Sequence, residues 1–580
     1  MGLNSVIFLI FVILSVLIYY MIPKKFQWGW LLIVSYIYYL SNAGWALVFI
    51  VTTTVTTWYA GLMLEREQSD SRRRMITVVT LLLNFGILAV LKYTNFAVSN
   101  ISSLFHLNLP TFKWVLPLGI SFYTFQSMGY LLDVCWKRQQ AEKNLLHFAL
   151  FVSFFPQIMQ GPIGRYERLA HQFFEEHRFD IRNMERGMQL IFWGLFKKMV
   201  LADTAAYYVN AIFDDPERYP GLSIFAILAY SIHLYGDFSG GIDVISGIAV
   251  LFGIELDKNF RQPYFAVNLT DFWHRWHITL GSWMKDYVFY PISLSGWMGS
   301  FGKWCRKKFG RKTGRTIPIA IANVMVFLIV GVWHGAAWQY IAYGLYNGLI
   351  IGVSGLLVQQ FRDWKKKLHI RDDSTRWHVF CVLRTFFIVN ISWFFDRALS
   401  LKMAFVMMKN AVTCFTPAEI LTDVNLRLCQ HNPTDMFVTV WLGILDLRTG
   451  LLTACNAGHE EPALRGADGV FRLCHDKHGF VLGGMKRSRY TDYELQLAPG
   501  DTVFVYTDGV TEASDEKLLF YETDRLLAAL NAPGPANPNE LLTAVQQSIQ
   551  DFVGQAEQAD DLTMLCIQYR GTETKDNTNT

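Results

Sequence analysis

Residues 317–358 have the sequence IPIAIANVMVFLIVGVWHGAAWQYIAYGLYNGLIIGVSGLLV, in which two apolar runs, 317–333 and 336–358, enclose one histidine, His334. Roughly 20 apolar residues are needed to cross the hydrocarbon of a bilayer. Both runs approach that length, and Gly335 between them favours a break in the helix. The stretch therefore predicts two membrane helices with a polar side chain where they meet.

Apolar runs recur over the first 400 or so residues. They lie near 3–22, 28–48, 49–64, 75–92, 114–134, 187–202, 221–236, 242–255 and 378–396. Together with the two runs above they predict an all-α polytopic membrane protein with about ten crossings. The shorter runs, and those with Gly, Pro or charge, are expected to be re-entrant or partly buried. The first run lacks a basic start and a cleavage site, so we expect a transmembrane helix and not a signal peptide.

Charge divides the chain into two parts. Residues from 411 onward hold 12 of the 52 Lys and Arg but 24 of the 48 Asp and Glu, so their net charge is −12 and that of 1–410 is +16. A basic apolar part followed by an acidic part indicates a membrane body joined to a soluble domain. We expect the body at 1–410, a soluble α+β domain at 416–570 and a disordered polar tail at 571–580. Nothing in the pattern indicates nucleic-acid binding.

The segment Lys303–Arg315 is the most basic loop, with seven Lys and Arg and no acidic residue. Such loops are retained on the cytoplasmic side of a membrane. A specific lipid-binding or donor-binding role is the alternative. The eight cysteines are scattered, with no C-x-x-C pair, which fits a reducing compartment better than a disulfide framework.

Four polar clusters lie within or beside the apolar runs, where polar groups are costly and usually functional. They are Gln157–Arg165, Tyr235–Asp243, Asp271–His277 followed by Trp283–Tyr287, and Val332–Ala336. In the first cluster, Gly161 and Pro162 should break a helix and expose backbone carbonyls to a cavity. The second cluster predicts a glycine-rich break that carries two carboxylates, Asp237 and Asp243. We expect these carboxylates to be partners of buried Arg or of backbone donors, and a catalytic role is the alternative.

His334 is the residue whose chemistry is most readily interpreted. A neutral imidazole at a helix break in lipid can take a proton from a hydroxyl, because its unperturbed pKa is near 6.5. The alternative is a hydrogen-bonded core histidine. His277, on an aromatic and basic segment, has a structural or interfacial role as its alternative. Without a nucleophilic Ser or Cys motif, a covalent acyl-enzyme is not required.

Six motifs follow one another in the order seen in membrane-bound O-acyltransferases. They are Ser121–Gln126, Gln160–Pro162, Gly194–Lys198, Asp237–Gly240, Phe272–His277 and Trp333–Gly335. The chain resembles the bacterial branch of alginate O-acetyltransferases and teichoic-acid D-alanyl transfer proteins. The resemblance implies a helical body with a tunnel and assigns catalysis to His334 and His277. It also implies tunnel or substrate-contacting roles for Gln160, Arg165, Asp237, Ser239, Trp273, Arg275, Trp276 and Trp333. His274 stands where the family usually has Arg.

The resemblance further implies the reaction. We expect transfer of an acyl group, acetyl first, from a cytoplasmic thioester such as acetyl-CoA to hydroxyls of an exported polysaccharide or cell-envelope glycan, with no separate cofactor. D-alanyl transfer to teichoic acid is the alternative, and a transporter is less favoured. Expected partners are the lipid bilayer and, as an open alternative, an extracytoplasmic acyl-accepting protein. The expected location is the bacterial inner membrane, crossed several times, with the C-terminal domain in the cytoplasm.

The acidic part has its own resemblance, to sporulation-type serine phosphatases of the PPM type. The matching motifs are Met436–Thr439, Asp446–Gly450, Asn456–His459, Leu482–Gly483, Pro499–Asp501, Tyr506–Val510, Thr511–Ala513 and Ala559–Thr563. The resemblance implies Mn²⁺ or Mg²⁺ ligands at Asp508 and Asp560, with Asp561 beside them. The family's Gly-Gly-Asp and Asp-Val-Ser-Gly-Lys-Gly segments are absent from 401–580. We therefore expect an inactive partial domain, and a membrane-anchored serine/threonine phosphatase is the alternative.

Overall fold

The computed structural model divides the chain into two units, Met1–Ala411 and Val412–Thr580, and each is described by itself. The described residues are 2, 5–216, 219–412, 416–430, 432, 436–476, 478–532, 537–556 and 561–571. Of the tail predicted at 571–580, all but Gly571 lies outside the described residues.

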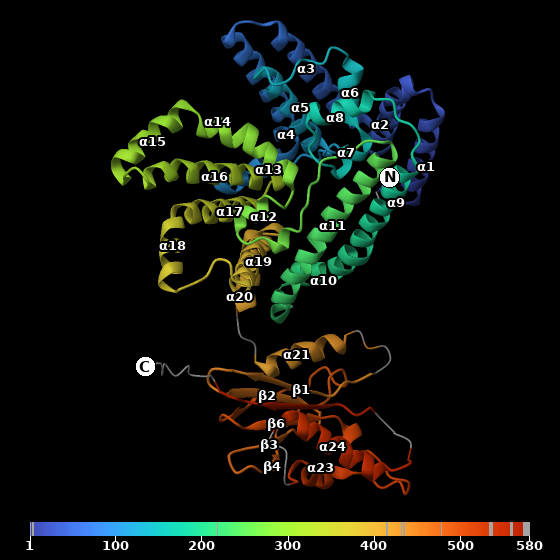
Figure 1. Cartoon of the computed structure of the whole chain (residues 1–580), viewed down its shortest axis with the longest axis vertical. Helices are drawn as coiled ribbons and strands as arrows, with labels where there is room; N and C mark the ends of the chain where they lie inside the picture. The colour runs from blue at the N-terminus through green and yellow to red at the C-terminus, as the bar shows by residue number, and fades with distance from the viewer. Residues whose placement is uncertain are drawn as a thin grey trace. The chain divides into compact units, whose positions relative to one another are not determined.

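The first unit is built from helices, as the apolar runs predict (Figure 1). Its N-terminal helices are α1 (Val6–Met21), α2 (Gln27–Ala43), α3 (Leu47–Arg66), α4 (Asp70–Phe105), α5 (Ile120–Cys135), α6 (Leu145–Ser153), α7 (Phe155–Gln160), α8 (Tyr166–Phe174), α9 (Ile181–Leu195) and α10 (Asp203–Asp214). The remaining ones are α11 (Ser223–Leu251), α12 (Leu269–Trp273), α13 (Ile278–Met284), α14 (Tyr290–Ser293), α15 (Gly296–Phe309), α16 (Thr313–His334), α17 (Trp338–Leu356), α18 (Val358–Lys367), α19 (Thr375–Arg397) and α20 (Leu401–Val412). Two π-helical turns, η3 (Phe196–Ala202) and η6 (Lys285–Phe289), continue α9 and α13.

Fewer helices meet the length and composition of a membrane span than the ten crossings expected. Among the described residues there are five such stretches, or six if the bent pair α17 and α18 counts as one. The five are Lys24–Arg66, Asp70–Phe105, Ser223–Leu251, Thr313–His334 and Thr375–Arg397. The count falls because the runs 3–22 and 114–134 form short helices, α1 and α5, of 16 residues each. In addition, the runs 28–48 and 49–64 fall within one stretch, Lys24–Arg66, and the runs 221–236 and 242–255 belong to one helix, α11. Polytopic membrane architecture itself is confirmed.

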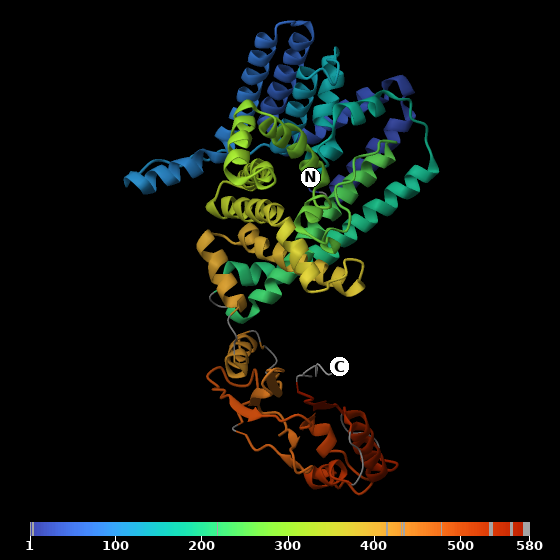
Figure 2. The same ribbon diagram turned by 60° about the vertical axis from the view of Figure 1, so that its left-hand side comes forward.

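The glycine-rich break predicted at Tyr235–Asp243 is wrong, because α11 runs through it without interruption. The glycines serve close packing against the helix formed by α9 and η3, which lies alongside α11 (Figure 2). A Cβ added to Gly194 would lie 2.5 Å from the carbonyl oxygen of Gly240, and one on Gly240 would lie 2.7 Å from that of Gly194. Small residues let two membrane helices approach in this way.

Helices α16 and α17 form a hairpin whose turn carries His334. Gly335 is extended and ends α16 at His334, so the break predicted there is confirmed. Gly331 and Gly344 face each other across the hairpin, where a Cβ on Gly331 would lie 3.1 Å from the Cα of Gly344. The close approach fixes the end of α16 against the start of α17.

The second unit is α+β, as predicted (Figure 1). Its helices are α21 (Pro417–Leu428), α22 (Asp508–Thr511), α23 (Glu522–Leu530) and α24 (Pro538–Val553). Its strands are β1 (Val440–Leu445), β2 (Leu451–Ala457), β3 (Ala463–Arg465), β4 (Phe471–Leu473), β5 (Tyr493–Gln496), β6 (Thr502–Tyr506) and β7 (Met564–Gln568). They form two antiparallel sheets, β1-β2-β5 and β4-β3-β6-β7. Apolar residues of β3, β4 and β6 pack with α23 and α24 in one buried cluster.

Candidate active site

One cavity of the helical unit brings the two predicted histidines together. It encloses about 380 Å³ and is lined by His334 at the end of α16 and by His277 at the start of α13. Trp273 and Trp276, both expected in the tunnel, also line it. The cavity wall is mainly apolar and continues along α16 through Val330 and its neighbours.

His277 is held by the loop that precedes α13. Its φ is +46°, a left-handed conformation that is uncommon for a residue other than glycine. The ring is 5% exposed, and its Nδ1 lies 3.2 Å from Oδ1 of Asn259. Burial lowers the pKa of His277 well below its ordinary value, and the nearby His334 lowers it further. The ring is therefore neutral, with Nδ1 donating to Asn259 and Nε2 left without a partner among the described residues.

His334 is more accessible, with its side chain 26% exposed. Its Nδ1 lies 3.3 Å from Oδ1 of Asp396, whose side chain is 9% exposed. The ring lies against Tyr343, with the two centroids 5.0 Å apart. At the same helix end, Lys92 and Tyr93 of α4 donate to the backbone carbonyls of Trp333 and Val332. These contacts satisfy carbonyls that the end of α16 would otherwise leave unpaired.

The three predicted tryptophans occupy different positions. Trp273 lines the cavity, and its indole N–H has no partner among the described residues. Trp276 also lines it and stacks on Phe272, with centroids 5.6 Å apart. Trp333 does not line this cavity and instead stacks on Phe125, with centroids 6.1 Å apart. Two of the three tryptophans thus line the cavity, and Trp333 packs between Phe125 and the ring of His277.

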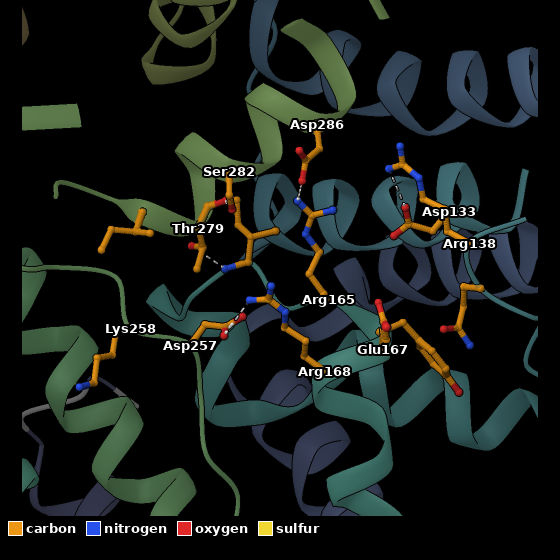
Figure 3. A pocket seen from close by; sticks show the side chains of 14 residues that line it. Asp133, Arg138, Arg165, Glu167, Arg168, Asp257, Lys258, Thr279, Ser282 and Asp286 are labelled. Carbon is orange, nitrogen blue, oxygen red and sulfur yellow. Dashed lines mark hydrogen bonds and ion pairs between the residues drawn. The ribbon is translucent and has the colours of Figure 1, made fainter. Parts of the chain in front are cut away.

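A second cavity, of about 330 Å³, lies beside the first and contains Arg165 (Figure 3). Ile278 and Ser282 line both cavities, so α13 forms part of the wall between them. Arg165 donates to Asp286 at 2.7 Å and to the hydroxyl of Tyr287. The other basic residues in this cavity are Arg138, Arg168 and Lys258, and Asp133 and Asp257 are ion-pair partners of Arg138 and Arg168. The predicted break at Gly161 and Pro162, between α7 and α8, places Arg165 here.

Four further predicted residues lie away from both cavities. Asp237 and Ser239 project from α11 toward η3, where Lys198 pairs with Asp237 and Nζ of Lys197 donates to Ser239 at 2.9 Å. Lys197 also pairs with Asp243 at 2.7 Å, so these groups join two helices.

Gln160 and Arg275 are the remaining two. Gln160 ends α7 and packs against Gly241 of α11. Arg275 donates to Asp271 at 2.8 Å, and its carbonyl accepts from Arg261 at 3.0 Å. Asp237, Ser239, Gln160 and Arg275 thus hold neighbouring segments of the helical unit together. None of the four lines either cavity.

Three residues that contact the histidines or their partners are absent from the sequence-based prediction. They are Asn259 beside His277, Asp396 beside His334, and Tyr230, whose hydroxyl donates to Asp396. Asp396 follows an apolar run in the segment Trp393-Phe-Phe-Asp396, and an acidic residue at such a place is a usable signal. The sequence around Asn259 and Tyr230 contains no comparable signal. Asn259 contacts His277 and Tyr230 contacts Asp396, and neither pair is close in sequence.

The predicted metal ligands do not assemble a metal site in the part of the second unit that is described. Asp508 begins α22 and Asp561 lies before β7, whereas Asp560 lies outside the described residues. Within the described ranges, no group of three or more His, Cys, Asp or Glu side chains could hold a metal ion. The described residues therefore do not fit a two-metal phosphatase centre.

Comparison with protein families matches each unit separately. The model described as "MBOAT, membrane-bound O-acyltransferase family" matches residues 137–395, and that of "Stage II sporulation protein E (SpoIIE)" matches 397–570. The second match shows that the acidic part is similar to the SpoIIE family.

Curated relatives match the helical unit. Over 438 residues, 69% of this chain and 78% of the relative, the chain is 30% identical to a peptidoglycan O-acetyltransferase of Helicobacter pylori. It is 31% identical over 366 residues (61% and 68%) to a probable alginate O-acetylase of Azotobacter vinelandii. It is 32% identical over 267 residues (43% and 60%) to a teichoic acid D-alanyltransferase of Bacillus subtilis.

Solved structures that resemble the chain include the RsbU and RsbW domains of a Mycobacterium tuberculosis protein. That likeness has 24% identity and a TM-score of 0.24, and covers 31% of this chain and 48% of that one. The phosphatase domain of the cell fate determinant SpoIIE from Bacillus subtilis is 14% identical, with a TM-score of 0.21 and coverage of 27% and 66%.

Proposed function

The chain belongs to the membrane-bound O-acyltransferase family and is an O-acyltransferase, and we propose that it moves an acetyl group from a cytoplasmic thioester to a hydroxyl of an exported polysaccharide or cell-envelope glycan. Relatives named as peptidoglycan and alginate acetylating enzymes support acetyl as the group and a glycan as the acceptor. D-alanyl transfer, the activity named for a shorter match, is the second candidate.

His334 is the general base of this reaction. The observation that carries the proposal is the single cavity shared by His334 and His277, since it holds the only two histidines that both the motifs and the resemblance select. Nε2 of His334 takes the proton of the acceptor hydroxyl as the hydroxyl oxygen attacks the thioester carbonyl. His277, neutral and buried beside it, contributes polarity without adding a charge.

Negative charge that develops on the carbonyl oxygen needs a donor in a dry site. The indole N–H of Trp273 meets this need, because it is buried, lacks a partner among the described residues and belongs to a cavity-lining residue. The acyl group passes directly between thioester and hydroxyl. No cofactor takes part in this scheme.

The thioester donor enters through the second cavity, which contains Arg165. Ile278 and Ser282 line both cavities, which supports a position of the donor's acyl end beside the cavity of His334. The basic segment Lys303–Arg315 favours the cytoplasmic side of a bacterial inner membrane for the start of α16, the end of the helix opposite to His334.

The test is acyl transfer by the full-length chain in liposomes. Radiolabelled acetyl-CoA with alginate or peptidoglycan fragments is compared with D-alanyl carrier protein and teichoic acid. We expect label on a glycan only from acetyl-CoA, and at least about 10²-fold less label for His334→Ala. His147→Ala, which replaces a half-buried histidine of α6 that lines neither cavity, is the matched control. Normal transfer by folded His334→Ala protein would refute the assignment.

A further inference from the structure

Three helices that are distant in sequence meet at the imidazole of His334. Tyr230 comes from α11, His334 from α16 and Asp396 from the last turn of α19. The hydroxyl of Tyr230 donates to Oδ2 of Asp396 at 2.7 Å, and Oδ1 of the same carboxyl lies 3.3 Å from Nδ1 of His334. The order Tyr230, Asp396, His334 is a chain of polar contacts that ends at the cavity.

The surroundings of Asp396 require an explanation. Its side chain is only 9% exposed, and burying an ionised carboxyl is costly unless it is paired. The adjacent Arg397 points its guanidinium elsewhere, donating to Asn210 at 2.6 Å and Asp214 at 3.0 Å. The described contacts of the carboxyl are therefore with Tyr230 and with the imidazole. A buried ion pair adds little to the stability of a fold. The position of Asp396 is therefore better explained by a role at His334.

We propose that Asp396 is a positioning residue that holds His334 in the tautomer with the proton on Nδ1. Nδ1 lies 3.3 Å from Oδ1 of Asp396, and a proton on Nδ1 leaves the lone pair of His334 on Nε2, the nitrogen available to a hydroxyl in the cavity. Tyr230 holds the carboxyl by its other oxygen and so fixes its orientation. The proposal rests on the role of His334 as general base, and it adds the groups that make that role possible.

The reaction transfers one proton through Nε2 of His334. The O–H bond of the acceptor breaks and its proton moves to Nε2 of His334, while the oxygen bonds to the carbonyl carbon of the thioester. The C–S bond then breaks, and the sulfur leaves with the proton from Nε2. The imidazolium that exists between the two transfers is stabilised by the carboxylate of Asp396. Asp396 itself neither gains nor loses a proton.

The central experiment is Asp396→Asn in the full-length chain in liposomes, with donor and acceptor each varied. We expect kcat to fall by about 10²- to 10⁴-fold, with both KM values within about twofold of the wild type, because orientation of the base is lost and binding is not. Asp214→Asn is the matched control, since it removes an exposed carboxyl that pairs with the adjacent Arg397. A kcat within twofold of wild type for folded Asp396→Asn overturns the proposal.

A second measurement separates positioning from a general structural role. If Asp396 acts only through the imidazole, His334→Ala with Asp396→Asn has the same residual rate as His334→Ala alone. A further loss in the double variant means that Asp396 supports the fold, which overturns the proposal while His334 remains the base. Full activity of His334→Ala would instead refute the proposed function itself.

Tyr230→Phe keeps the proposal testable if Asp396→Asn does not fold. It removes one hydroxyl and leaves both carboxyl and imidazole in place, so we expect kcat to fall about 3- to 30-fold with KM unchanged. Tyr346→Phe is its control, because Tyr346 donates to the carbonyl of Ile388 at 2.9 Å and not to Asp396. Equal kcat values for the two Tyr→Phe variants overturn the proposal.

Discussion

Oδ1 of Asn259 lies 3.2 Å from Nδ1 of His277, and the same oxygen accepts hydrogen bonds from the backbone N–H and the hydroxyl of Thr279 at 3.0 and 2.9 Å. One side chain thus holds both the left-handed histidine and the first turn of α13. The backbone of Asn259 adds a further contact, accepting from Ile278 at 3.0 Å. The cavity wall beside His334 therefore depends on a residue outside every motif.

Asn259→Ala should weaken both stability and acyl transfer. The change leaves the hydroxyl of Thr279 and the Nδ1–H of His277 buried without their acceptor, at a cost of about 1–3 kcal/mol. Transfer should fall by about tenfold or more because the wall of the cavity moves. Thermal unfolding in detergent and initial rates in liposomes measure the two effects. Asn42→Ala, on the exposed end of α2, should change neither. Wild-type stability in Asn259→Ala would contradict this account of α13.

Gly240→Ala should loosen the packing of α11 against α9. The new Cβ would lie 2.7 Å from the carbonyl oxygen of Gly194, so one helix must shift, at a cost of about 1–3 kcal/mol. A lower melting temperature of the purified protein is the expected result. Gly29→Ala is the control, because no atom lies within 4 Å of its added Cβ and a helical Ala is favoured over Gly by up to about 1 kcal/mol. Similar melting temperatures for the two variants would show that α11 does not need its glycines.

A cysteine at position 308, in the variant Lys308→Cys, should be cytoplasmic. Seven basic residues in Lys303–Arg315 oppose translocation of this segment. In a background without other cysteines, a membrane-impermeant maleimide should label the new thiol only after the cells are permeabilised. Labelling of intact cells would reverse the topology and, with it, the side from which the thioester enters.

The full-length chain should show no Mn²⁺-dependent hydrolysis of a phosphoserine peptide. Asp508 matches a ligand position, but the described residues near it do not form a group that could hold a metal. Release of phosphate at equal rates with Mn²⁺ and with a chelator is the expected outcome. Activity that needs Mn²⁺ and disappears in Asp508→Asn would instead establish the anchored phosphatase as a second function.

The sequence by itself determined the helical architecture, the change to an α+β unit and the break at His334. These are local properties: length and apolarity decide whether a segment can span, and Gly335 decides where α16 ends. The tertiary structure decided the rest. Gly240 belongs to a segment that predicts a helix break, yet α11 is continuous there. The reason is tertiary, because Gly240 packs closely against Gly194 of the neighbouring helix α9. Asp396 reaches His334 only because α19 packs beside the α16–α17 hairpin, and no local pattern specifies which helices become neighbours.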